Sequence, residues 1–126
     1  MPSSFSSPAA EQDPACIALV ITTVDDETVA QNMARAMVEQ RLAACVQIQA
    51  IESTYIWEAA LQEHKEWQLS CKTTASGSAA LQQALLEMHP YAVPMLYALP
   101  VAWVHRPYAD WVAQRVADAQ IRPDQV

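Results

Sequence analysis

The sequence predicts one α+β domain of the ferredoxin-like type, with a four-stranded antiparallel sheet and its helices on one face. The expected elements follow the order strand, helix, strand, strand, helix, strand, with a short helix at the end. Both longer helical segments carry a single apolar stripe, so each has one face to bury. Two helices cannot cover both faces of such a sheet, and the compact arrangement places them together on one face.

The first strand and helix have clear signals. Residues 16–22 are almost continuously apolar, which predicts a central strand that is covered on both faces. Asp25 or Asp26 is expected to cap a helix that runs to about Gln40. The apolar stripe of this helix comprises Val29, Met33 and Met37.

Residues 45–58 and 66–74 are predicted to form a long hairpin, with a polar tip at 59–65. The second strand alternates apolar and polar residues. In the first strand the apolar positions change phase near Ala50 and Ile51, which predicts a bulge or a kink there, because a strand changes faces only through an extra residue or a bend. The hairpin is too long for the edge of a small monomer, so another chain is expected to complete it.

The second half of the chain is punctuated by proline. A helix is expected to begin at the only glycine, Gly77, and to end before Pro90. Residues 95–103 read as an edge strand, because Pro100 cannot donate to a hydrogen-bond ladder. Pro107 occupies a first helical turn and predicts the final helix.

The apolar content predicts an obligate symmetric oligomer. Apolar residues make up 52% of the 126 positions, and no run is long enough for a membrane-spanning helix. The surplus apolar surface is therefore expected in a subunit interface. Residues 1–15 are expected to form a disordered tail, residues 16–119 the single domain, and residues 120–126 a loose C-terminal tail.

Charge and cysteine usage exclude several classes of partner. The net charge of −7 argues against nucleic acid and anionic membrane, because both require a basic patch. The three cysteines form no CxxC pair, which favours buried reduced thiols in a cytoplasmic protein and leaves a soft-metal ligand as the alternative. The first fifteen residues lack the pattern of a signal peptide.

Most enzyme and cofactor motifs are missing. A single glycine excludes loops that cradle phosphate groups, which need several glycines at fixed spacing. No nucleophile elbow is present, and the histidines at positions 64, 89 and 105 do not have the spacing of a helical zinc pair.

Two clusters remain as candidate sites. Trp57 and Glu58, with Lys72 on the partner strand, are expected to form either a ligand pocket or a salt bridge beneath an aromatic ring. His89 and Tyr91 lie in a loop bounded by two prolines, where His89 is either a helix cap or part of a functional loop.

Sulfur-containing and aromatic side chains add further alternatives. Cys71, Met88 and Met95 are either soft ligands for copper(I) or core residues. Tyr108 and Trp111 are expected to pack between helix and sheet or to form an interface pair.

Five short signatures, which span about residues 17–116, together resemble the CutA family of divalent-cation tolerance proteins. They are Arg41-Leu-Ala-Ala-Cys-Val46, Trp57-Glu58, Lys72-Thr-Thr74, His89-Pro-Tyr91-x-x-Pro94 and Tyr108-x-x-Trp111. The resemblance implies a ferredoxin-like protomer in a tight homotrimer, similar to the PII signalling proteins. It also implies a cytoplasmic, non-enzymatic protein that is linked to tolerance of copper and other divalent cations.

The resemblance also implies a cleft between subunits. Its residues would be Trp57, Glu58, Lys72, His89 and Tyr91, with Tyr108 and Trp111 at its wall and His89 as a metal ligand. The chain departs from the family pattern at three positions. Met95 stands where an acidic residue is usual, Ala59 where many members have glycine, and Thr22 where some bacterial members have cysteine.

Three functional hypotheses follow. The leading one is a trimeric metal-tolerance protein without catalysis, which binds copper or another divalent cation weakly if at all. The alternative is a PII-like sensor that holds a small anionic metabolite against Lys72. The third is a hydrolase with Glu58 as general base and His89 as general acid, which requires that the two groups converge on one spot.

Overall fold

The computed structural model describes residues 16–117, so the tails predicted at 1–15 and 120–126 lie outside the described residues. The elements are β1 (Ile17–Val24), α2 (Glu27–Glu39), β2 (Cys45–Trp57), β3 (Ala60–Thr74), α3 (Ser78–Met88), β4 (Leu96–Pro100) and α4 (Arg106–Arg115). The predicted ferredoxin-like α+β fold is confirmed.

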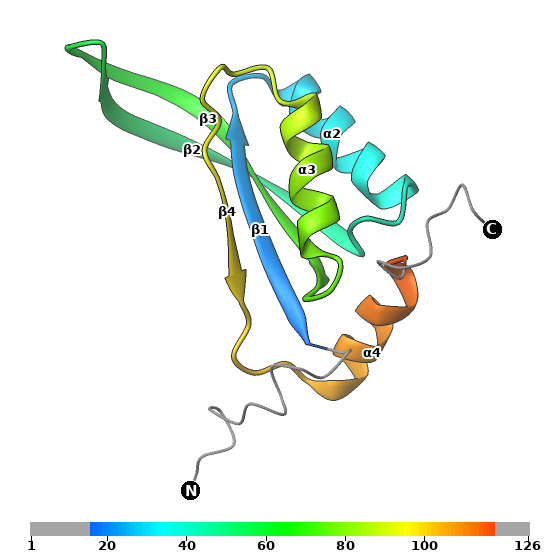
Figure 1. The fold of residues 1–126 in the computed structure, drawn as a ribbon. Helices are drawn as coiled ribbons and strands as arrows, with labels where there is room; N and C mark the ends of the chain where they lie inside the picture. Colours follow the sequence, from blue (N-terminus) through cyan, green and yellow to red (C-terminus); the bar gives the residue numbers. More distant parts are fainter. Residues whose placement is uncertain (1–15, 118–126) are drawn as a thin grey trace, which may run out of the picture.

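The four strands form one antiparallel sheet in the order β2-β3-β1-β4. The central position of β1 and the edge position of β4 are therefore as predicted. Helices α2 and α3 cover one face of the sheet, and α4 lies at the end of the sheet where β1 begins (Figure 1). β4 is shorter than expected because its partner strand, β1, begins at Ile17. Pro100 pairs with Ala18, and Val101 N–H donates to Ile17 O at the start of β1.

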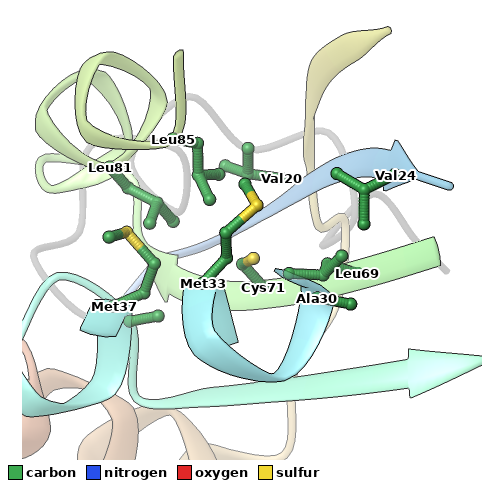
Figure 2. Packing of buried hydrophobic residues seen from close by; sticks show 10 residues of the cluster. Val20, Val24, Ala30, Met33, Met37, Leu69, Cys71, Leu81 and Leu85 are labelled. Carbon is green, nitrogen blue, oxygen red and sulfur yellow. The ribbon is translucent and has the colours of Figure 1, made fainter. Parts of the chain in front are cut away.

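The main core lies between the sheet and helices α2 and α3. Met33 and Met37 from α2 meet Leu81 and Leu85 from α3 above the strands (Figure 2). The sheet contributes Val20, Val24, Leu69 and Cys71. A smaller cluster packs α4 against the start of β1 through Ile17, Ala44, Ala109, Val112 and Val116.

Local sequence explains where the helices begin. The Asp26 side chain accepts a 3.0 Å hydrogen bond from Val29 N–H, so it satisfies one free donor of the first turn of α2. Gly77 caps α3 at φ −90°, and its position leaves no room for a side chain. A Cβ atom there would lie 2.9 Å from Thr74 Oγ1 and 3.0 Å from Val116 Cγ1.

Arg41 holds α4 against the end of α2. Its backbone has a positive φ of 61°, and its guanidinium group donates to Gln114 O at 3.1 Å and Arg115 O at 3.3 Å. These carbonyls belong to the last turn of α4, where they lack partners within the helix. Ala117 N–H donates back to Arg41 O at 2.9 Å, so the two segments bind each other in both directions.

The predicted hairpin exists, but the predicted position of its tip and the predicted bulge were wrong. The pairing of β2 with β3 is continuous from Cys45–Lys72 to Trp57–Ala60, so no residue is inserted near Ala50. The turn comprises Glu58 and Ala59 alone, both at positive φ (52° and 67°), as in a type I′ turn. Residues 60–65, which were expected in the tip, belong to β3.

The change of apolar phase in β2 has another cause. Val46 and Ile48 pack on the core beneath the helices, whereas the outer part of the hairpin projects beyond them (Figure 1). There the even-numbered face has no helical cover, and Ile56 is 64% exposed. The apolar positions of β2 therefore change from even to odd numbers where the helices cease to cover the strand, and this change requires no distortion of the strand. The projecting part, residues 50–67, is called the arm below.

Candidate functional site

The His89–Tyr91 segment joins α3 to the end of β1. His89 is the C-cap of α3, and its Nε2 lies 2.9 Å from Thr23 O. Its Nδ1 accepts a 3.2 Å hydrogen bond from Tyr91 N–H. The two rings meet edge to face, with their centroids 4.8 Å apart. The structure therefore brings these two predicted site residues together.

Glu66 is the residue that sequence reasoning missed. Its carboxylate accepts hydrogen bonds from the Tyr91 hydroxyl at 2.8 Å and the Ser53 hydroxyl at 2.7 Å, and the residue is only 6% exposed. Within the described residues it has no ion-pair partner. One signal could have revealed it: the odd-numbered apolar phase of the outer β2 strand implies that the face carrying Glu66 is covered there.

Burial and hydrogen bonding change the acid–base properties of this group. Burial lowers the pKa of His89 below its ordinary value, although the Thr23 carbonyl and the charges of Glu66 and Asp25 act in the opposite direction. Burial raises the pKa of Tyr91 above its ordinary value, and the hydrogen bond to Glu66 adds to the effect. At neutral pH the imidazole is therefore neutral and the phenol is protonated.

Lys72, Tyr108 and Trp111 lie at the other end of the sheet. Lys72 pairs with Cys45 at the base of the hairpin, and its ammonium group donates to Gln47 Oε1. The Tyr108 and Trp111 rings are stacked, with centroids 5.8 Å apart. Burial raises the pKa of Tyr108, and the neighbouring Cys45 side chain adds to this. The next residue, Ala109, belongs to the same buried cluster as Ala44, so this part of α4 lies close to the base of the hairpin as well.

Trp57 and Glu58 lie at the tip of the arm, far from the other candidates. Lys72 pairs with Cys45 at one end of β2, and Trp57 is at the other end of β2. The two ends of this strand lie roughly 40 Å apart at ~3.3 Å per residue. The expectation that these side chains form one pocket within a chain was therefore wrong. A single protomer distributes the seven predicted residues over three places: the tip, the base and the His89–Tyr91 segment.

The same geometry separates the two groups of the hydrolase hypothesis. His89 contacts Thr23, which lies in register with Gln68 and, through it, with Gln49. Glu58 follows nine positions later along the arm, which corresponds to about 30 Å. Within one chain the proposed base and acid do not converge on a substrate.

The described residues do not fit a metal ion well. Residues 16–117 contain no group of three or more His, Cys, Asp or Glu side chains that could hold one. Both ring nitrogens of His89 already have hydrogen-bond partners. Cys71 points into the core (Figure 2), and burial raises the pKa of its thiol to about 12. Cys71 is therefore not available as a thiolate ligand that would bind copper(I) together with Met88 or Met95.

None of the described helices is both long and apolar enough to span a membrane.

Known proteins give a consistent family assignment. The family model of the CutA1 divalent ion tolerance protein matches residues 18–115. The divalent-cation tolerance protein CutA of Thermus thermophilus is 41% identical over 97 residues, which cover 76% of this chain and 94% of the relative. Human protein CutA is 39% identical over 114 residues, which cover 90% of this chain and 64% of the relative.

Solved structures agree with this assignment. CutA from Synechococcus elongatus superposes with a TM-score of 0.78 at 42% identity, covering 82% of this chain and 92% of that one. A second structure of that protein, complexed with a Bis-Tris molecule, gives a TM-score of 0.75 at 42% identity and covers 80% and 94% of the two chains. The chain belongs to the CutA1 family of divalent ion tolerance proteins.

Proposed function

We propose that this chain forms a cytoplasmic homotrimer that serves tolerance of divalent cations, copper among them, without catalysis of its own. Its ligand site would be a cleft between subunits. The observation that carries the proposal is the separation of the candidate residues: Trp57 and Glu58 at the tip lie roughly 40 Å from Lys72 at the base. A site that contains both Lys72 and the pair Trp57 and Glu58 must therefore take them from two different copies of the chain.

The exposed apolar side chains support assembly. On the arm, Ile56 and Leu61 are 64% and 61% exposed. On β4, Tyr97 and Leu99 are 48% and 47% exposed. These two surfaces belong to different parts of the protomer, so a contact between them would be head-to-tail, and a head-to-tail contact forms a ring when its rotation closes. A three-membered ring would cover both surfaces in every subunit.

Family membership supports the role in metal tolerance, and the relatives carry that name. Direct metal binding is expected to be weak, because residues 16–117 of one chain hold no cluster of metal-binding side chains. The thiols of Cys45 and Cys71 form no disulfide, which is consistent with a reducing compartment.

One observation favours the second candidate, a PII-like sensor that binds a small anionic metabolite. Within the described residues, the Lys72 ammonium group contacts the neutral side chain of Gln47 and no carboxylate. An uncompensated cation at the mouth of a cleft attracts an anion. The Synechococcus relative in complex with Bis-Tris shows that a CutA protein can hold a small organic molecule.

Light scattering tests the assembly. At micromolar concentration the native protein should have three times the mass of one chain. Leu61→Glu places a charge on the arm and should yield smaller species, whereas Glu39→Gln, at an exposed position on α2, should leave the mass unchanged. A well-folded native monomer would overturn the proposed cleft.

Calorimetry separates the two candidate ligands. Metal-free protein is titrated with copper(II), zinc(II) and a panel of nucleotides and carboxylates. Weak metal binding without binding of any anion supports the tolerance reading. Binding of an anion that is lost in Lys72→Met, with no heat from either metal, supports the sensor.

A further inference from the structure

Four segments of the chain are joined by one continuous series of hydrogen bonds. Ser53 on β2 donates to Glu66 on β3, which also accepts from Tyr91. The Tyr91 amide then donates to His89, whose other ring nitrogen contacts Thr23 at the end of β1. The series therefore links the base of the arm to the loop between α3 and β4.

The chemistry of the partners fixes the state of His89. A backbone N–H can only donate, so Nδ1 of His89 must present its lone pair to Tyr91. A backbone carbonyl can only accept, so Nε2 must carry the proton that it donates to Thr23. His89 is therefore the neutral Nε2–H tautomer, with both nitrogens in use.

A metal ion at His89 would have to break this arrangement. Coordination at Nδ1 takes the lone pair that accepts from Tyr91 N–H. Coordination at Nε2 removes the proton donated to Thr23 O and moves it to Nδ1, where it faces another donor. Either route leaves a backbone group without its hydrogen-bond partner, which is destabilising when that group is buried.

The carboxylate of Glu66 anchors the other end. It is 6% exposed, and each oxygen accepts one hydroxyl. A buried carboxylate needs such donors to offset its loss of hydration. The Tyr91 hydroxyl is thus held in place by a group that cannot turn toward solvent, and Pro90 and Pro94 restrict the backbone on both sides.

We propose that Glu66, Tyr91 and His89 form a clasp that positions the 89–94 loop on the base of the arm, and that His89 is a positioning residue of this clasp and not a metal ligand. The clasp makes the loop and the arm one rigid unit. In a trimer, this unit would present the loop and the arm to a neighbouring subunit in a fixed relation.

The state of His89 can be tested in the unmodified protein. Two-bond ¹H–¹⁵N correlation spectra at neutral pH should show Nδ1 of His89 unprotonated and Nε2 protonated. One equivalent of zinc(II), added to metal-free protein, should leave both resonances in place. The opposite tautomer, or a stoichiometric zinc-induced shift of either His89 nitrogen, would overturn the proposal.

Hydrogen exchange tests the positioning role. Tyr91→Phe removes only the hydroxyl that contacts Glu66, and it should speed exchange of the Tyr91-position amide about tenfold through the loss of a hydrogen bond to a charged group. Glu39→Gln, at an exposed position at the end of α2, is the control and should leave that amide unchanged. Equal exchange in Tyr91→Phe and the native protein would contradict the clasp.

Discussion

Trp57 and Lys72 lie at opposite ends of one hairpin: Lys72 pairs with Cys45 at its base, whereas Trp57 pairs with Ala60 at its tip. Sequence resemblance groups the two residues in one cleft, but the geometry of a single chain keeps them apart. A cleft that uses both residues takes them from different subunits. Measurements of assembly therefore come before measurements of ligand binding.

Trp57→Ala is expected to weaken assembly and to leave the protomer folded. The side chain is 49% exposed in one chain, so its removal costs the isolated fold little. In an interface the same truncation removes a large buried aromatic, at a cost of about 2 kcal/mol or more. The melting temperature of the variant should fall more steeply on dilution than that of the native protein. An identical dilution profile would show that Trp57 is not in the interface.

Ala59→Gly is expected to stabilise the hairpin. Ala59 has a φ of 67° in the two-residue turn, a conformation that glycine adopts without the steric cost of a Cβ atom. The gain should be about 1 kcal/mol in the free energy of unfolding. Denaturant unfolding measures it. Ala60→Gly, one position later in β3, is the control and should destabilise the protein.

Gly77→Ala is expected to destabilise the protein through steric contact alone. The φ of −90° suits any residue, but the added Cβ would lie 2.9 Å from Thr74 Oγ1 and 3.0 Å from Val116 Cγ1. Overpacking of this kind costs about 1–3 kcal/mol. Ala80→Ser, at an exposed position of α3, should change the unfolding free energy by less than about 0.5 kcal/mol. Equal midpoints for the two variants in urea would contradict the steric explanation.

Cys71 is expected to resist alkylation in the folded protein. Burial raises the pKa of its thiol from 9.0 to about 12, so almost no thiolate is present at pH 8. Because the folded pKa lies above the unfolded one, the thiol stabilises the fold fully below pH 9, and this contribution is lost as the pH rises toward 12. Mass spectrometry after iodoacetamide treatment should find Cys71 unmodified until guanidinium is added. Rapid labelling of Cys71 in buffer would show that the core opens.

The order of the elements and the layer of helices follow from patterns within short windows of sequence. The stripe that contains Met33 and Met37, and the apolar run of β1, carry that information locally. The turn at Glu58 and Ala59 could not be found in this way, since neither residue is typical of a type I′ turn. Residues 60–65 of β3 pair with β2 although most of them are polar, and a short polar segment of this kind is typical of a loop.

The candidate site was less predictable because it depends on register. Glu66 becomes a buried acceptor only when the α3–β4 loop places Tyr91 above it, 25 positions later in the chain. Lys72 moves away from Trp57 only because the pairing extends without a break. Resemblance to a family supplies the names of the residues, and the strand register decides which of them one chain can bring together.

The edge strand β4 has five residues and ends at Pro100. A ribbon this short, closed by a residue without an amide hydrogen, offers an incoming strand few consecutive donors and no means of lengthening the ladder. A strand that paired with this edge of β4 would therefore form only a short ladder. The opposite edge of the sheet, β2, has 13 residues and no proline, so only one of the two free edges limits strand pairing between chains in this way.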